Sequence, residues 1–280
     1  MVLLAGLGDT AQLYRGLAPA LADRHRVVGL TRRGHGRSER PESGYELDTL
    51  VEDIRRLLDR LAIERSILVG HSFGGLEMPL FAKRYPERVA AIVYLDALFP
   101  VLDPEPDLSG DPIWSVVPRG GPTADDLVSR DAYLSYFKRA RPAWAQIWCE
   151  AIEADLMDKA TIQDNGHLEY HHNDGLMNNI YAQTWATRNP EYEGVKAPML
   201  AIVPDGDFHP SVPQDAPDEL RQAADQYWRH RLLPWIRQRT ETFRRAVPSA
   251  RVVELDSPHH HIFLAREEET VKAILDFSAR

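Results

Sequence analysis

The 280-residue chain carries 42 acidic and 33 basic side chains, and its formal net charge of −9 disfavours a role in nucleic-acid binding. Hydrophobic residues make up 44% and charged residues 27% of the chain, which argues against a disordered or fibrous protein. The single cysteine, Cys149, excludes an intramolecular disulfide and a cysteine-based zinc site.

The apolar runs of the sequence are too short to cross a bilayer. The first residues carry neither the basic region nor the long apolar stretch of a signal peptide. Together with the lone cysteine, these features predict a cytoplasmic protein with no membrane partner.

Short apolar, β-branched segments alternate with helical patterns along most of the chain. The expected strands are 2–5, 27–30, 66–69, 91–95, 199–203 and 252–255. The expected helices are 13–22, 47–61, 76–84 and 267–277. This alternation predicts an α/β fold with a mostly parallel, doubly wound sheet and helices on both of its faces.

The middle of the chain breaks this alternation. Residues 100–122 are rich in Pro, Asp and Gly, and residues 124–157 are rich in aromatic side chains. We predict that this part of the chain forms a mostly helical insertion. The amphipathic segment 211–246 is expected to pack beside the insertion, and its many arginines are expected to form a solvated helix face.

A Gly-x-Ser-x-Gly motif, centred on Ser72, follows the expected strand 66–69 and precedes an apolar helix. In this setting the chain must reverse sharply, so the serine hydroxyl is exposed at the carboxyl end of the strand as a nucleophile. The first helical turn offers unpaired N–H groups, and the Phe73 N–H is placed to bind a developing oxyanion. The alternative is a glycine-rich turn whose serine only caps the helix.

Four stretches together resemble the α/β-hydrolase fold superfamily, and in particular a serine esterase or lactonase with a helical cap. They are LLAGLGD at 3–9, TRRGHGRS at 31–38, the turn at Ser72 and HHHIFL at 259–264. The resemblance implies a sheet of about six to eight strands, and it implies that Leu7 supplies a second oxyanion N–H. It also implies that 100–195 forms a mostly helical cap over the site, inserted into a core formed by 1–99 and 196–280. Ala5 stands where this loop often has His. The hairpin that usually opens the sheet has no counterpart before Val2, so either the sheet is trimmed or the native start lies upstream of Met1.

A serine nucleophile needs a base, and imidazole has a suitable pKa. His260 follows the last expected strand and falls on the family pattern, while a shift by one residue selects His259 or His261. A metal cluster, in which the 259–261 run is joined by His167, His171 and His172, is the disfavoured alternative. His71 and His35 are expected to be structural neighbours of their motifs.

The acid that orients the base has two main candidates. Asp96 directly ends the expected strand 91–95, whereas Asp207 follows the strand 199–203, the commoner position in the family. We favour Asp96 by a narrow margin, keep Asp207 as the alternative acid, and give Asp205 the remaining weight.

These residues predict hydrolysis of a carboxylic ester or lactone through an acyl-enzyme, without a cofactor or a metal. The expected partner is a small, apolar substrate. The sequence leaves open whether the protein forms a homodimer. Alternatives in the same scaffold are amide or C–C bond hydrolysis and cofactor-free peroxidation. Another is a ligand-binding receptor or scaffold with little turnover.

Overall fold

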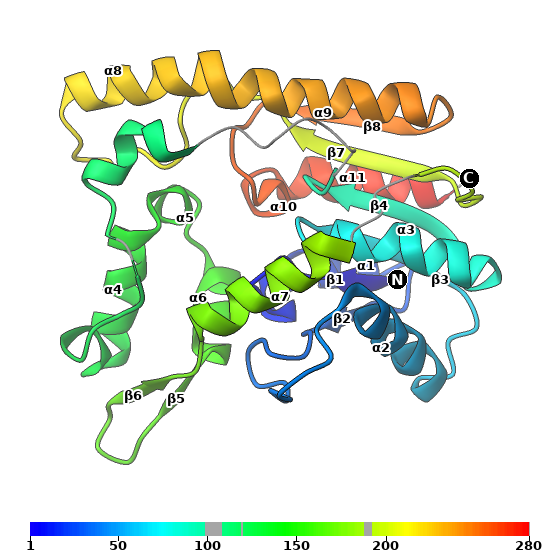
Figure 1. Ribbon diagram of the computed structural model, residues 1–280, viewed down its shortest axis with the longest axis horizontal. Helices are drawn as coiled ribbons and strands as arrows, with labels where there is room; N and C mark the ends of the chain where they lie inside the picture. The colour runs from blue at the N-terminus through cyan, green and yellow to red at the C-terminus, as the bar shows by residue number, and fades with distance from the viewer. Residues whose placement is uncertain (99–107, 119, 188–191, 280) are drawn as a thin grey trace.

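The computed structural model describes residues 1–98, 108–118, 120–187 and 192–279, arranged as Figure 1 shows. Six parallel strands form one sheet in the order β2-β1-β3-β4-β7-β8. They are β1 (Val2–Leu4), β2 (Val28–Leu30), β3 (Ser66–His71), β4 (Val89–Leu95), β7 (Met199–Pro204) and β8 (Arg251–Leu255). The predicted α/β class is confirmed, and all six expected strands are present.

Helices cover both faces of the sheet because the strands bury alternate side chains on opposite sides. Leu3, Val69 and Val93 belong to one core cluster, together with apolar residues of α1, α10 and α11. The neighbouring residues Leu4 and Leu68 belong to a second cluster, with residues of α2, α3 and α9. The helices of these two layers are α1 (Leu17–Ala22), α10 (Ile262–Ala265), α11 (Glu267–Ser278), α2 (Leu47–Arg60), α3 (Gly74–Arg84) and α9 (Leu233–Ala246).

Residues 108–187, which we call the insert, lie between β4 and β7 in the chain. The insert contains α4 (Arg130–Ala140), α5 (Pro142–Gln146), α6 (Glu150–Asp158), α7 (Asp174–Thr187) and the antiparallel strands β5 (Ala160–Ile162) and β6 (Leu168–Tyr170). The arrowheads of β4 and β7 point toward the insert in Figure 1, so it stands at the carboxyl ends of these strands. Positions 100–107, 119 and 188–191 of the predicted cap lie outside the described residues.

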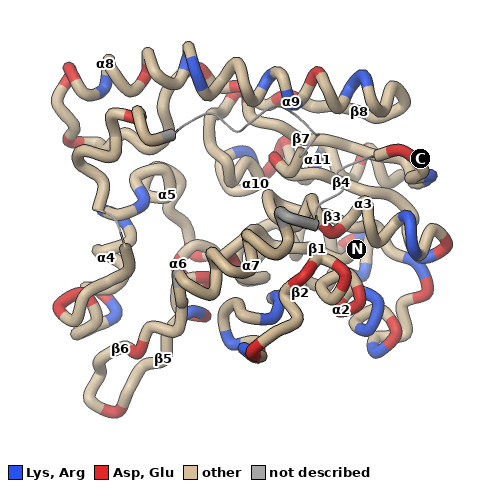
Figure 2. The backbone as a smooth tube through the Cα atoms, viewed as in Figure 1, with Lys and Arg blue, Asp and Glu red and all other residues tan. Residues whose placement is uncertain are grey.

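A long helical rod borders the insert and the sheet at the top of Figure 1. It consists of α8 (Asp218–Tyr227), a π-helical turn (Trp228–Leu232) and α9. Figure 2 shows acidic and basic residues interspersed along this rod and along α2. The prediction of a solvated arginine face is wrong for Arg239, which is 8% exposed because it turns inward to an acidic partner.

Among the helices of the described ranges, none combines the length and the apolar character that crossing a membrane requires.

Candidate active site

Ser72 lies in the turn between β3 and α3. Its φ of 47° falls in the left-handed region, which non-glycine residues rarely adopt. The turn is tight because backbones pack closely around it: a Cβ on Gly74 would lie 2.6 Å from the Leu4 carbonyl oxygen. The half-buried serine therefore emerges at the carboxyl end of the sheet, where it lines a cavity together with Leu7 and His260.

Asp96 and His260 form a hydrogen-bonded pair beside this turn. Asp96 follows β4 directly, and its φ of 41° turns the buried carboxylate toward the loop after β8. His260 Nδ1 donates to Asp96 Oδ2 at 2.6 Å. Arg239 Nη2, from α9, donates to the other carboxylate oxygen at 2.9 Å. Burial opposes ionisation of Asp96, but the charge of His260, its hydrogen bond and the Arg239 charge outweigh it and lower the Asp96 pKa to about 2.

Asp205 and Asp207 are engaged elsewhere. Asp205, at the end of β7, accepts a hydrogen bond of 2.6 Å from Arg237 Nε. Asp207 is exposed, and its backbone carbonyl accepts from Arg229. The structure therefore brings His260 together with Asp96 and with neither of the other two candidates.

The proposed nucleophile and base line the same cavity without a direct bond. Within the described part of the chain, no hydrogen bond links Ser72 Oγ to His260 or to any other group. The backbone N–H groups of Leu7 and Phe73 likewise carry no recorded intramolecular bond in these residues. Hydrogen bonds of this kind often form only in the complex with substrate, so their absence does not argue against these catalytic roles.

Arg32 braces the loop that contains Leu7. Its guanidinium donates to the carbonyl oxygens of Ala5 at 3.0 Å and Gly6 at 3.4 Å. Glu77, on α3, holds the guanidinium through two hydrogen bonds of 2.6 and 2.8 Å. Arg32 is 4% and Glu77 2% exposed, so this pair ties the loop after β1 to the helix after Ser72. Ala5 stands where this loop often has His, and Arg32 of the TRRGHGRS motif holds the loop in place here.

A buried polar cluster lies behind the same loop. Asp9 Oδ2 accepts from His261 Nε2 at 3.2 Å and lies 3.6 Å from His71 Nδ1, while Lys159 Nζ lies 4.0 Å from Asp9 Oδ1. Lys159 also pairs with Asp155. Burial opposes ionisation of Asp9, but the hydrogen bond and charge of His261 hold its pKa well below the usual range. Burial, reinforced by the charge of His261, lowers the pKa of His71 to about 4, so its ring is neutral at physiological pH.

Within the described residues, potential metal ligands converge in this cluster, which shares only His261 with the histidine set considered from the sequence. One ligand atom each of Asp9, His71 and His261 lies within 4.8 Å of the others. Lys159 already supplies positive charge to Asp9, and His261 Nδ1 already accepts from Trp144 Nε1 at 3.2 Å. These contacts indicate a structural cluster that supports the loop.

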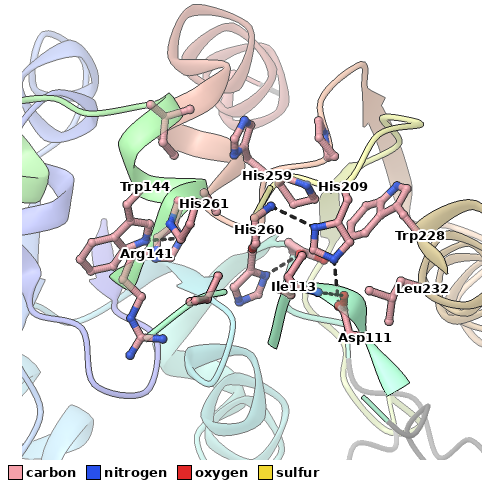
Figure 3. Close-up of a pocket in the computed structure, with 18 of the residues that line it drawn as sticks. Asp111, Ile113, Arg141, Trp144, His209, Trp228, Leu232, His259, His260 and His261 are labelled. Atoms are coloured by element: carbon pink, nitrogen blue, oxygen red, sulfur yellow. Dashed lines mark hydrogen bonds and ion pairs between the residues drawn. The ribbon is translucent and has the colours of Figure 1, made fainter. Parts of the chain in front are cut away.

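Two cavities meet at His260. The Ser72 cavity measures about 340 Å³ and includes Lys159 and His172 in its wall. The aromatic cavity measures about 460 Å³, and its apolar wall includes Trp114, Trp144, Trp228, Trp235, Ile113, Ile147, Leu232 and Ile236. In the view of Figure 3, His260 separates Trp144 and Arg141 from the His209–Asp111 pair. The π-helical turn contributes Trp228 and Leu232, in keeping with the frequent occurrence of such turns at functional sites.

The aromatic residues of the insert are divided between cavity walls and the core. Trp114 and Trp144 line the aromatic cavity, and Phe137 lines the Ser72 cavity. Tyr133 is fully buried in the core cluster, and Trp148 packs against that cluster. The aromatic rings of the insert therefore form part of the cavity walls and part of the core.

Comparisons with known proteins agree with this architecture. A family model of the alpha/beta hydrolase fold matches residues 1–130. The 2-(acetamidomethylene)succinate hydrolase of Mesorhizobium japonicum is 32% identical over 135 residues, which cover 48% of this chain and 47% of that protein. The non-heme chloroperoxidase of Streptomyces lividans is 38% identical over 91 residues, 31% of this chain and 33% of that protein. The chain thus spans about half or less of the curated relatives it matches.

A solved structure extends the likeness to the whole chain. The crystal structure of E-2-(acetamidomethylene)succinate hydrolase has a TM-score of 0.70 at 24% identity, covering 100% of this chain and 91% of that one. The parallel sheet, the serine turn after its third strand along the chain and this structural match define an α/β-hydrolase fold. The chain therefore has the α/β-hydrolase fold, and its first 130 residues match the family model of that fold.

Sequence reasoning missed several residues of the site. Arg239, Arg32 and Glu77 act through pairings between segments far apart in the chain, and Asp9 and Lys159 meet only when the insert packs against the core. No local pattern marks such pairs. The available signals were the positions of Arg32 inside the TRRGHGRS motif and of Asp9 inside the LLAGLGD motif, which suggested a role for each stretch but no partner.

Proposed function

We propose that the protein is a serine hydrolase that cleaves a carboxylic ester or lactone through an acyl-enzyme. The observation that carries the proposal is the Asp96–His260 hydrogen bond of 2.6 Å, placed beside a strained serine that lines the same cavity as His260. Strained backbone of this kind clusters at active sites.

Proton transfer follows from the hydrogen bonds of His260. Its Nδ1–H is held by the Asp96 carboxylate, so Nε2 is the nitrogen free to accept a proton. Rotation of the Ser72 side chain on substrate binding brings Oγ to Nε2, which takes the hydroxyl proton as Oγ attacks the carbonyl carbon. His260 then gives that proton to the leaving alcohol, and a water molecule, activated by the same nitrogen, releases the acid.

The N–H groups of Leu7 and Phe73 are proposed to stabilise the oxyanion. Phe73 immediately precedes α3, whose helix dipole favours negative charge at this end. The Arg32–Glu77 pair keeps the loop of Leu7 and the start of α3 in a fixed relation. Because the donors are preorganised, little reorganisation is needed when charge develops on the substrate oxygen.

The insert is proposed to act as the cap over the site, within the division into core 1–99 and 196–280 and cap 100–195. It contributes Trp114, Ile113 and Trp144 to the aromatic cavity and Phe137 to the Ser72 cavity. This apolar wall suits a small substrate with an apolar portion.

Replacement of Ser72 by alanine tests the proposal. We expect Ser72→Ala to lose at least about 10⁴-fold in kcat/KM on p-nitrophenyl esters and to lose labelling by a fluorophosphonate. The matched control is Ser115→Ala, at an exposed serine of the insert, which should retain both. Hydrolysis that survives in Ser72→Ala would refute the assignment, and a folded wild-type protein that is never labelled would favour the ligand-binding alternative.

A second candidate is hydrolysis of an amide or a C–C bond in the same site. The relative from Mesorhizobium japonicum is named for hydrolysing 2-(acetamidomethylene)succinate, and this name favours the candidate. The name of the chloroperoxidase relative likewise makes peroxidation a further candidate reaction. Turnover of matched esters and amides by wild type and Ser72→Ala separates ester from amide hydrolysis.

A further inference from the structure

Arg141 stands at the junction of the two cavities. Only four residues in the described part of the chain line both of them: Arg141, Trp144, His260 and His261. Three of these already have side-chain partners, since His260 bonds to Asp96 and Trp144 bonds to His261. Figure 3 shows Arg141 beside Trp144, with its side chain extended away from that ring system.

Charge pairing around the cavities leaves Arg141 unmatched. In the aromatic cavity, Asp96 is paired with Arg239 and His260, and Asp111 accepts from His209 Nε2 at 2.9 Å. In the Ser72 cavity, Lys159 lies near Asp9, which also accepts from His261. Among the charged residues of these walls that the structure describes, Arg141 alone has neither an ion pair nor a side-chain hydrogen bond. Arg141 is exposed to solvent, and it is the charged residue of these described walls that no protein group neutralises.

Hydrogen bonds fix the backbone of Arg141, so the point from which its charged side chain extends is also fixed. Its N–H donates to the Phe137 carbonyl at 2.8 Å, closing α4. Its carbonyl accepts from Trp144 N at 2.9 Å and Ala145 N at 3.0 Å, opening α5. Pro142, the first residue of α5, further restricts the junction. A guanidinium on such a base loses less freedom on binding than one on a loop.

We propose that Arg141 binds a carboxylate of the substrate and so selects anionic esters. This inference rests on the proposed hydrolase function and names its substrate class. A guanidinium matches a carboxylate with two parallel, charge-assisted hydrogen bonds. The neighbouring walls from Trp144, Ala140 and Pro142 offer few competing acceptors, which favours the pairing with a substrate anion. A substrate of this class combines a carboxylate near Arg141 with an apolar portion in the aromatic cavity.

A kinetic test uses esters that differ only in charge. Benzyl half-esters of succinic, glutaric and adipic acid place the carboxylate on the acyl side, and carboxymethyl esters place it on the leaving-group side. Their primary-amide counterparts are neutral and nearly isosteric. Wild type is expected to prefer at least one anionic member over its amide, and Arg141→Gln to reduce kcat/KM for that member by about 10- to 100-fold, mainly through KM. The neutral esters should change by less than about two-fold.

Control variants separate charge recognition from a structural effect. Arg139→Gln removes a cation from the last turn of α4, two residues before Arg141, where it pairs with Asp126, and should leave the preference intact. Arg141→Lys should restore part of it. An equal loss on charged and neutral esters in Arg141→Gln, or no preference in wild type, overturns the proposal.

A binding measurement keeps this test independent of serine chemistry. Calorimetry on Ser72→Ala protein would use the mono-benzylamides of the same diacids, which retain the carboxylate. We expect binding to weaken at least about 10-fold when Arg141→Gln is added. Absence of binding, or equal binding with and without Arg141, overturns the anion site. Conversely, ester hydrolysis that persists in Ser72→Ala while this binding difference remains would overturn only the proposed function.

Discussion

Two side chains of the proposed triad lie on backbone that L-residues seldom adopt. Ser72 and Asp96 have φ values of 47° and 41°, and they follow the neighbouring strands β3 and β4. Such conformations cost on the order of 1–3 kcal/mol each and persist only where the surrounding structure enforces them. The Ser72 N–H donates to Leu95 and the Asp96 N–H to Ile202, so both strained residues are anchored to adjacent strands.

The role of the acid can be tested by removing only its charge. We expect Asp96→Asn to lower kcat about 10³- to 10⁴-fold on esters, because an amide at this position can favour the wrong His260 tautomer. Asp207→Asn, in an exposed loop position, should stay within about two-fold. Thermal unfolding of each variant checks that the protein remains folded, since Asp96 also pairs with Arg239. A crippled Asp207→Asn with an active Asp96→Asn would reverse the assignment.

At the scale of residues, the sequence predicted where candidate catalytic residues lie better than it predicted which of them pair with one another. It singled out Ser72 through a motif that requires a strand on one side and a helix on the other. It left Asp96 and Asp207 nearly equal, because both follow strands of the sheet. What distinguishes them is the turn at Asp96 and its contact with Arg239, 143 positions away, and no local pattern encodes either. Nothing in the sequence pointed to Arg141, because its proposed role depends on its position between two cavities that only the folded chain forms.

At the scale of elements, the close approach of α3 to the sheet fixes the nucleophile. The first residues of α3 are Gly74 and Gly75, and a Cβ on Gly75 would collide with the Ala97 carbonyl oxygen just beyond β4. That contact is with backbone, so no side-chain rotation can relieve it. The helix, the serine turn before it and the end of β4 therefore behave as one packed unit.

Substitution at this contact should affect stability and activity together. We expect Gly75→Ala to lower the free energy of unfolding by about 1–3 kcal/mol, because α3 must move away from β4, and to lower kcat/KM as the turn at Ser72 shifts. Gly110→Ala is the matched control: its Cβ would lie 3.8 Å from Tyr227 Cε2, an ordinary contact, and should change stability by less than about 0.5 kcal/mol. Urea unfolding and ester kinetics on both variants test this expectation. Equal stability and equal activity of the two variants would contradict the packing argument.

The strands of the main sheet were predictable for a physical reason. Buried on both faces, they read as short apolar runs bounded by Gly, Pro or charged residues. The hairpin of β5 and β6 was not predicted, because its strands have three residues each and Ile162 is 57% exposed, so no alternation distinguishes them from a loop. The π-helical turn between α8 and α9 also has no signature in the hydrophobic pattern.

For the whole molecule, buried histidines couple folding to pH. Burial lowers the pKa of His35 to about 3 and the pKa values of His71 and His259 to about 4, against about 6.5 in an unfolded chain. Burial raises the pKa of Asp155 to about 6, which acts in the opposite direction. Near pH 5 these four groups together bind about two more protons in the unfolded chain than in the folded one, three on the histidines less one on Asp155.

This difference predicts a steep loss of stability in mild acid. Lowered histidine pKa values mean that protons favour the unfolded state as pH falls below about 6.5, so the free energy of unfolding should drop by about 2.7 kcal/mol per pH unit near pH 5. His35→Gln should reduce this slope by about 1.4 kcal/mol per unit, because one of the three buried rings is gone. His167→Gln, at an exposed ring of the insert, should not. Urea unfolding from pH 7 to pH 4.5 measures the slopes, and equal slopes for His35→Gln and wild type would show that His35 is protonated within the fold despite its burial against Arg32.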